Sequence, residues 1–212
     1  MMKAIAFCQL RVAVAAIALA PVAAPAASPP VSNPKDVKMM HDLARCVAAR
    51  KTGDVRRLLA TDYRTDAYQG AMRQMSRSAS GCAKFTGRLR MGGVLMAGAL
   101  AEAMLARNEA AAPLAQRLAP DPSKPSVVAR DEGEFLGLCI ARTMPAAVQA
   151  LLATAPESNA EKASIASLAP NLAPCVQAGA SARVNRPALR AILALAAYRL
   201  TSSADAAHLA GS

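Results

Sequence analysis

The chain has 212 residues and is basic, with 25 lysines and arginines against 14 aspartates and glutamates and a formal net charge of +11. This charge favours an anionic partner, but three tyrosines, three phenylalanines and no tryptophan leave few rings to stack on nucleic-acid bases. The sequence contains no glycine-rich phosphate loop, H-E-x-x-H pair or close cysteine cluster. The common linear motifs of nucleotide-binding proteins, zinc proteases and zinc fingers are therefore excluded.

The first 26 residues have the composition of a secretory signal peptide. Lys3 and Arg11 precede an apolar run over residues 12–20, and small side chains follow up to Ala26. This order of charged, apolar and small residues predicts cleavage near Ala26. The apolar run is shorter than the roughly 20 residues that a membrane-spanning helix needs. We therefore expect a periplasmic or secreted protein that does not span a membrane after signal cleavage.

Residues 27–107 are expected to form a unit of four helices. The first helix carries apolar residues at helical spacing, namely Met39, Met40, Leu43, Cys46 and Val47. A short second helix carries the apolar pair Leu58 and Leu59. The third helix is predicted over residues 66–78, and the fourth over residues 93–107. Because the fourth is the most apolar, we expect it at the centre of the fold.

A proline-rich connector is predicted over residues 108–130, followed by a second four-helix unit over residues 131–201 and a flexible tail over residues 202–212. The second unit repeats the first, since residues 42–107 align without a gap on residues 135–200, 93 positions later. The run Leu-Leu-Ala-Thr recurs in this alignment, and each cysteine of one unit falls on a cysteine of the other. Such a repeat indicates a duplicated packing unit and implies no reaction.

Four cysteines remain after the predicted cleavage, two in each unit and 36 residues apart in both. An exported chain with an even number of cysteines is expected to form disulfides. Three connectivities are possible, and the symmetry of the repeat is compatible with all of them. We favour bonds within each unit, Cys46 with Cys82 and Cys139 with Cys175, because a single unit before duplication had only its own two cysteines to pair.

Strand signals are scarce, so the sequence predicts an all-α protein. Each unit is small for an independent hydrophobic core, and the two are expected to pack against each other. The predicted architecture is two tandem four-helix repeats packed as a pseudo-two-fold helical bundle, each with an internal disulfide.

The same four features mark each repeat: a cysteine in the first helix, the Leu-Leu-Ala-Thr run, a second cysteine and an apolar fourth helix. In the first repeat they are Cys46, residues 58–61, Cys82 and residues 93–107. In this combination the chain resembles a loosely defined class of uncharacterised exported proteins of alphaproteobacteria. The resemblance covers about two thirds of the chain. It rests on structural motifs and implies no activity for any residue.

The excess of positive charge lies in the first repeat. Residues 27–118 hold 15 basic and 7 acidic residues, against 8 and 7 over residues 119–212. The candidate anion-binding residues are Arg50, Lys51, Arg56, Arg57, Arg88 and Arg90. Such a surface suits an anionic envelope component, namely lipid, lipopolysaccharide or polysaccharide, and we expect no specific nucleic-acid target for an exported chain. The alternative is a solvated helix surface without a ligand.

No catalytic residue is predicted. His41 and His208 are the only histidines, and His41 has no nucleophile at a diagnostic spacing. Methionines near His41 suit copper(I), but methionine more often fills a core, so no metal or cofactor is predicted. The sequence therefore predicts a non-enzymatic binding or structural component of the envelope. The alternative is an envelope enzyme whose site forms between the repeats without a linear motif.

Overall fold

The structure is a computed structural model that describes residues 33–78, 80–82, 93–107, 112–122, 126–176 and 184–210. The predicted signal peptide lies outside these residues, as do Arg88 and Arg90. We call residues 33–107 the N-terminal half and residues 112–210 the C-terminal half.

The described part of the chain is helical and contains no strand, which confirms the all-α prediction. In the N-terminal half the elements are α1 (Pro34–Arg50), α2 (Thr52–Ala60), α3 (Asp66–Ser78), the short 3-10 turn η1 (Ser80–Cys82) and α4 (Gly93–Arg107). In the C-terminal half they are α5 (Leu114–Leu118), α6 (Glu132–Thr143), α7 (Pro145–Leu152), α8 (Asn159–Leu168), the 3-10 turns η2 (Ala169–Asn171) and η3 (Ala173–Cys175), and α9 (Arg186–Ala210).

Local sequence signals set where several helices begin. The side chain of Asn33 accepts a hydrogen bond from the Lys35 backbone N–H at the start of α1. Asp131 accepts from the Glu134 N–H at the start of α6, and Ser158 accepts from the Glu161 N–H at the start of α8. These side chains satisfy backbone donors that have no partner inside the helix. Pro145 occupies the first turn of α7, where its missing N–H costs nothing.

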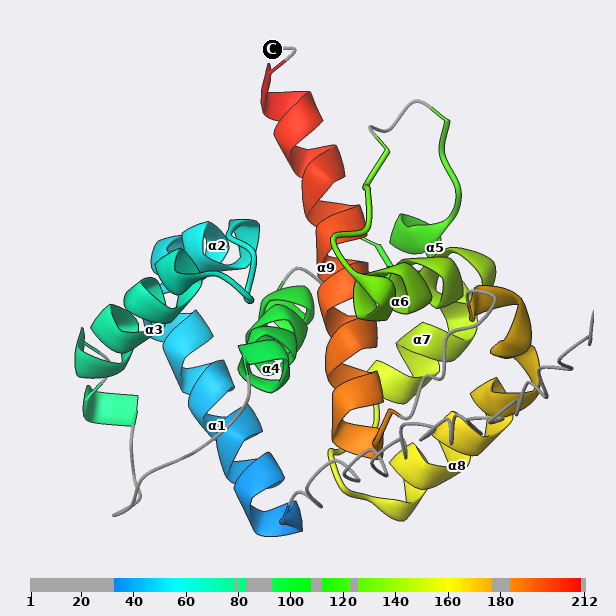
Figure 1. The fold of residues 1–212 in the computed structure, drawn as a ribbon, viewed down its shortest axis with the longest axis horizontal. Coiled ribbons are helices and arrows are strands. Elements are labelled where there is room, and N and C mark those ends of the chain that lie inside the picture. Colours follow the sequence, from blue (N-terminus) through cyan, green and yellow to red (C-terminus); the bar gives the residue numbers. More distant parts are fainter. Residues whose placement is uncertain are drawn as a thin grey trace, which may run out of the picture.

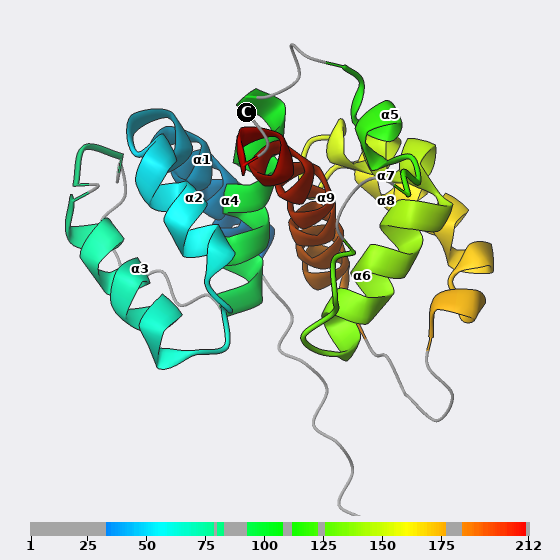
Figure 2. The same ribbon diagram turned by 90° about the horizontal axis from the view of Figure 1, so that it is seen from above.

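The long helix α9 runs through the middle of the molecule, with α4 on one side and α6 on the other (Figures 1 and 2). Helix α1 packs on α4, and α2 and α3 lie further out on the same side. Helices α5, α7 and α8 lie on the opposite side of α9. Helices α4 and α9 thus form the centre of the molecule, as expected for the apolar segment α4.

Two glycines allow the central helices to approach closely. A Cβ atom at Gly98 of α4 would overlap the Cα and Cβ atoms of Ala191 in α9 and would lie 2.6 Å from the Ala191 carbonyl oxygen. A Cβ atom at Gly137 of α6 would lie 2.7 Å from Cγ2 of Ile192 and 2.9 Å from its carbonyl oxygen. On both sides of α9 a backbone carbonyl oxygen thus lies within 3.0 Å of the added Cβ, and backbone cannot move aside as a flexible side chain can.

We expect Gly98→Ala to destabilise the protein by about 1–3 kcal/mol, because the added methyl group would force α4 and α9 apart. Gly70→Ala on α3 is the matched control, since the nearest atom to its added Cβ is a guanidinium nitrogen of Arg73, at 4.0 Å. That control should stabilise by roughly 0.5–1 kcal/mol, because alanine is the better helix former. Urea denaturation of both variants measures the difference, and two shifts of the same sign would contradict the close packing of α4 on α9.

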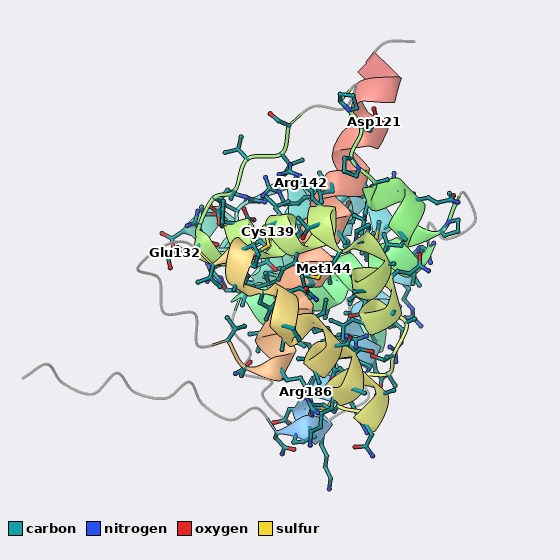
Figure 3. The ribbon with its side chains drawn as sticks, turned by 90° about the vertical axis from the view of Figure 1, so that its right-hand side faces the viewer. Asp121, Glu132, Cys139, Arg142, Met144 and Arg186 are labelled. Carbon is teal, nitrogen blue, oxygen red and sulfur yellow. A yellow bond between two sulfur atoms is a disulfide. The ribbon has the colours of Figure 1, made fainter. Side chains whose placement is uncertain are left out.

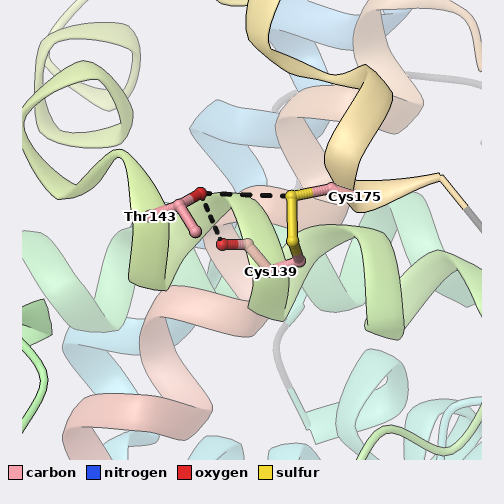
Figure 4. The surroundings of a disulfide bond; sticks show 3 residues. All are labelled: Cys139, Thr143 and Cys175. Carbon is pink, nitrogen blue, oxygen red and sulfur yellow. Dashed lines mark hydrogen bonds between the residues drawn. A yellow bond between two sulfur atoms is a disulfide. The ribbon is translucent and has the colours of Figure 1, made fainter.

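Both predicted disulfides are present. Cys46 on α1 is bonded to Cys82 in η1, and Cys139 on α6 is bonded to Cys175 in η3, each over a sequence separation of 36 residues. At the second bond the Thr143 hydroxyl donates to the Cys139 carbonyl oxygen at 2.8 Å and lies 4.0 Å from the sulfur of Cys175 (Figure 4). The favoured pairing is confirmed. Bonds of this kind are typical of oxidising compartments outside the cytosol.

The last helix continues further toward the C-terminus than the sequence predicts. The backbone of residues 202–210, expected as a flexible tail, continues α9 as far as Ala210. Alanine occupies four of these nine positions, and it is the strongest helix former. Among the described residues no single helix has both the length and the hydropathy to cross a membrane. Only α6 and α7 taken together are long and apolar enough, and these two helices meet at a bend of 108°.

Candidate functional site

Four of the six predicted anion-binding residues are among the described residues, and they lie at the end of α1 and on α2. Arg50 is the last residue of α1, Lys51 connects the helices, and Arg56 and Arg57 project from α2. Both α2 arginines and Arg50 are exposed, and Lys51 is half-buried. Cationic groups therefore gather at one corner of the N-terminal half.

Local carboxylates neutralise only part of this corner. Arg57 forms an ion pair with Asp54 on the same helix. The guanidinium group of Arg50 lies against Gly81 beside the first disulfide, and not on a carboxylate. Among the described residues Arg50, Lys51 and Arg56 have no ion-pair partner. Three cations are thus available to an external anion.

A cavity of about 620 Å³ opens at a second place, between the two halves of the molecule. Helices α1 and α4 form one wall, and α5, α7 and the turn after α7 form the other. The polar side chains on these walls are His41, Arg45, Glu102, Arg117, Gln149 and Thr154. The remaining lining residues are alanine, leucine and proline.

The base of this cavity rests on a buried arginine. Arg190 of α9 is 1% exposed. Its Nε and Nη2 atoms donate to the two carboxylate oxygens of Glu102 at 2.8 and 2.7 Å, a bidentate pair that joins α9 to α4. Its Nη1 atom donates to Glu161 of α8 at 3.1 Å. One guanidinium group therefore links both halves of the molecule.

The same guanidinium group closes the C-terminal end of α7. It donates to the backbone oxygens of Leu151 and Leu152 at 3.3 Å each, and to that of Thr154 at 2.7 Å. Helix ends leave their last carbonyl groups without partners, and a cation there also interacts favourably with the helix dipole. Although burial by itself lowers the pKa of Arg190, the hydrogen bonds and charges of Glu102 and Glu161 outweigh this effect and raise it.

The turn between α7 and α8 belongs to this network. Glu157 has a positive φ of 61°, which is unusual for a residue other than glycine. Its N–H donates to Glu161 at 2.9 Å, and its carboxylate pairs with Arg186 at the start of α9. Arg186 also lies 3.2 Å from Glu161, on the α8 side of the molecule (Figure 3). Burial raises the pKa of Glu161, and Arg190 opposes the rise.

His41 enters the cavity from α1. Its Nδ1 atom lies 3.8 Å from a Glu102 oxygen, and its residue is 6% exposed. Burial lowers the pKa of His41, Glu102 opposes this effect, and Arg190 adds to it. The imidazole is therefore neutral at pH 7, because its ordinary pKa of 6.5 is already below that pH.

The groups around His41 are occupied in ways that disfavour acid–base catalysis. Both carboxylate oxygens of Glu102 are held by Arg190. The Thr154 hydroxyl donates to the Leu151 carbonyl oxygen at 2.6 Å and accepts from Arg190 at 3.1 Å. A nucleophile needs a base within hydrogen-bond reach, and this hydroxyl has its proton engaged elsewhere. The arrangement positions helices and shapes a cavity.

A second buried carboxylate fastens the connector to the core. Glu134 of α6 is 4% exposed and accepts from Arg199 of α9 at 2.6 Å and from the Arg130 backbone N–H at 2.8 Å. Arg199 also donates to the Val128 carbonyl oxygen at 3.2 Å. Neither Glu134 nor Arg199 is among the site residues predicted from the sequence.

Sequence reasoning missed the residues that shape the cavity, apart from His41. Glu102 and Arg190 are charges that interrupt apolar segments of the sequence. That interruption was the available signal, because a lone charge within an apolar helix must find a partner when the helix is buried. Arg117 lies in the connector, where no periodicity indicated its position. Comparisons with protein-family models, with curated proteins and with solved structures find no match to this chain.

Proposed function

We propose that this chain is an exported, non-enzymatic binding protein whose N-terminal half contacts an anionic component of the cell envelope. The observation that carries the proposal is the corner formed by Arg50, Lys51 and Arg56, whose charges have no carboxylate partner among the described residues. The chemistry that such a corner recognises is clustered phosphate or carboxylate, as in lipid head groups, lipopolysaccharide or acidic polysaccharide.

Export is supported by the order of residues 1–26 and by the two disulfides, which suit the periplasm or the extracellular space. It also agrees with the exported class that the repeat resembles.

We propose further that the two halves derive from one duplicated helical unit, packed about a pseudo-two-fold axis. Helix bounds support this origin, since a shift of 93 residues carries the first residues of α2, α3 and α4 onto those of α7, α8 and α9. The same shift carries Ser80–Cys82 onto Ala173–Cys175. The Arg190 network has no counterpart in the N-terminal half, because the equivalent position is Ala97.

An envelope enzyme with a site between the halves is the second candidate, and the meeting of His41 and Glu102 in the cavity favours it. Binding is preferred because Glu102 and the Thr154 hydroxyl are both engaged in fixed hydrogen bonds. A reaction would need a nucleophile or base that neither group provides.

Sedimentation with phosphatidylglycerol vesicles tests the binding surface. We expect the mature protein to bind these vesicles, to bind phosphatidylcholine vesicles weakly, and to dissociate as salt rises, because exposed charges are screened by salt. Lys51→Gln with Arg56→Gln should weaken binding at least threefold. Parallel assays with lipopolysaccharide and polygalacturonate identify which anion binds best.

The matched control is Arg142→Gln with Lys162→Gln, which removes the same charge from exposed positions of the C-terminal half. The proposal fails if both double variants lose affinity equally, since net charge alone would then explain binding. It also fails if retention is indifferent to salt for all three anions.

A further inference from the structure

We propose that the cavity between the two halves binds a small organic anion that has an apolar body. This site is separate from the basic corner, because Arg50, Lys51 and Arg56 do not line it. The inference therefore does not depend on the function proposed above, and either can fail alone.

The size of the cavity suits a small molecule. Ligand sites in proteins range from about 300 to 1,000 Å³ and are mostly apolar, with a few polar groups that set orientation. At about 620 Å³ this cavity lies within that range. Its apolar lining comes from both halves, with Ala99, Ala103 and Leu105 on α4 facing Leu114 on α5 and Leu152 on α7. A ligand body there would be enclosed by aliphatic side chains from both sides.

Positive charge stands on both walls. Arg45 lies on α1 and Arg117 on α5, so each half contributes one guanidinium group to the lining. Arg45 pairs with Asp42 on the surface, where the two side chains are 58% and 69% exposed. An exposed pair of this kind contributes little stability, so Arg45 can turn to a ligand at small cost. Guanidinium groups also suit carboxylate, sulfonate and phosphate, which they bind in a bidentate manner.

Glu102 is the one carboxylate on the walls, and it repels an anion less than an unpaired carboxylate would. Glu102 is neutralised by the bidentate contact with Arg190, at 2.7 and 2.8 Å. His41 is neutral, and an imidazole in that state still has one N–H to donate. Arg45 and Arg117 are the other charged side chains on the lining. The lining therefore contributes two guanidinium groups and one carboxylate, a composition that suits an anion better than a cation.

The walls are held in place before any ligand arrives. Arg190 ties α4, α7 and α8 to α9. The side chain of Gln149 on α7 accepts from the Ala115 N–H at 2.8 Å, which fixes α5 against α7. A preformed cavity avoids much of the ordering cost of binding.

The test uses 1-anilinonaphthalene-8-sulfonate, an aromatic anion, and the uncharged N-phenyl-1-naphthylamine, which shares its ring system. Fluorescence titration of the folded mature protein should show one saturable site for the sulfonate, with the neutral probe at least fivefold weaker. Arg45→Gln with Arg117→Gln should weaken sulfonate binding at least fivefold and leave the neutral probe within twofold. Arg73→Gln with Arg77→Gln on α3 removes the same charge away from the cavity and should change neither titration.

A second variant tests the cavity without touching charge. Ala106 lines the cavity at an exposed position of α4, so Ala106→Leu fills space without burying a new group in the core. It should weaken both probes at least fivefold while the melting temperature is retained. Unchanged titrations in Ala106→Leu would overturn the site. Equal affinity for the two probes would overturn its preference for an anion.

Discussion

Replacing Arg190 by methionine is expected to lower the free energy of unfolding by about 3–5 kcal/mol. Methionine keeps most of the volume of the side chain but leaves Glu102 and Glu161 without their shared cation. Removing one member of a buried ion pair carries a cost of this size, because an uncompensated charge remains in a poorly solvated place. The backbone oxygens at the end of α7 would also lose their donors. Urea denaturation followed by circular dichroism measures the change.

A double-mutant cycle identifies the source of that loss. Glu102→Gln alone should destabilise, whereas Glu102→Gln combined with Arg190→Met should cost less than the sum of the two single changes, because the two groups interact directly. Arg142→Met is the control, since Arg142 is exposed and donates only to the Val127 carbonyl oxygen, at 3.1 Å. Exposed ion pairs contribute at most about 1 kcal/mol. If Arg190→Met lowers the free energy of unfolding by less than that, Arg190 does not hold the halves together.

Loss of either disulfide is expected to cost about 4 kcal/mol. The estimate follows from closure of a loop with a sequence separation of 36 residues, which restricts the unfolded chain. Cys46→Ser with Cys82→Ser, and Cys139→Ser with Cys175→Ser, should each lower the melting temperature and retain a helical spectrum. Helicity should survive because α1 and α6 remain packed on α4 and α9.

Reduction of the unaltered protein is the control for this experiment. Reduced protein should melt below both double variants, because each variant keeps one of the two bonds. Peptide mapping without reductant should recover Cys46 linked to Cys82 and Cys139 linked to Cys175. An unchanged melting temperature in a double variant would show that its bond does not stabilise the fold.

The helices and the cysteine pairing were accessible from the sequence because their causes are local or repeated. Apolar spacing on α2 predicted its buried side, since Leu58 and Leu59 are in the core. On α1, Met40 and Val47 are buried, and the other three apolar residues predicted there are only partly buried. The pairing within each unit followed from the matching cysteines of the two units. The end of α9 was missed because small residues at a chain terminus were interpreted as a tail, although alanine favours helix.

The Arg190 network was not accessible in the same way. Glu102 and Arg190 are 88 residues apart, and nothing near either position in the chain specifies the other. Their meeting depends on α4 packing against α9, which in turn depends on the close approach of Gly98 to Ala191. The alignment of the two halves did not help, since position 97 of the N-terminal half, which aligns with Arg190, is an alanine.

By itself the sequence determined the helical class, the order of the helices, the two disulfides and the uneven charge of the two halves. These properties arise from interactions between residues a few positions apart, from the cysteine spacing or from composition. Only the tertiary structure decided which buried charges meet, where a cavity opens and which groups line it. Such contacts depend on the mutual packing of α1, α4, α5, α7 and α9, and the free energy of that packing is shared among residues distant in the chain.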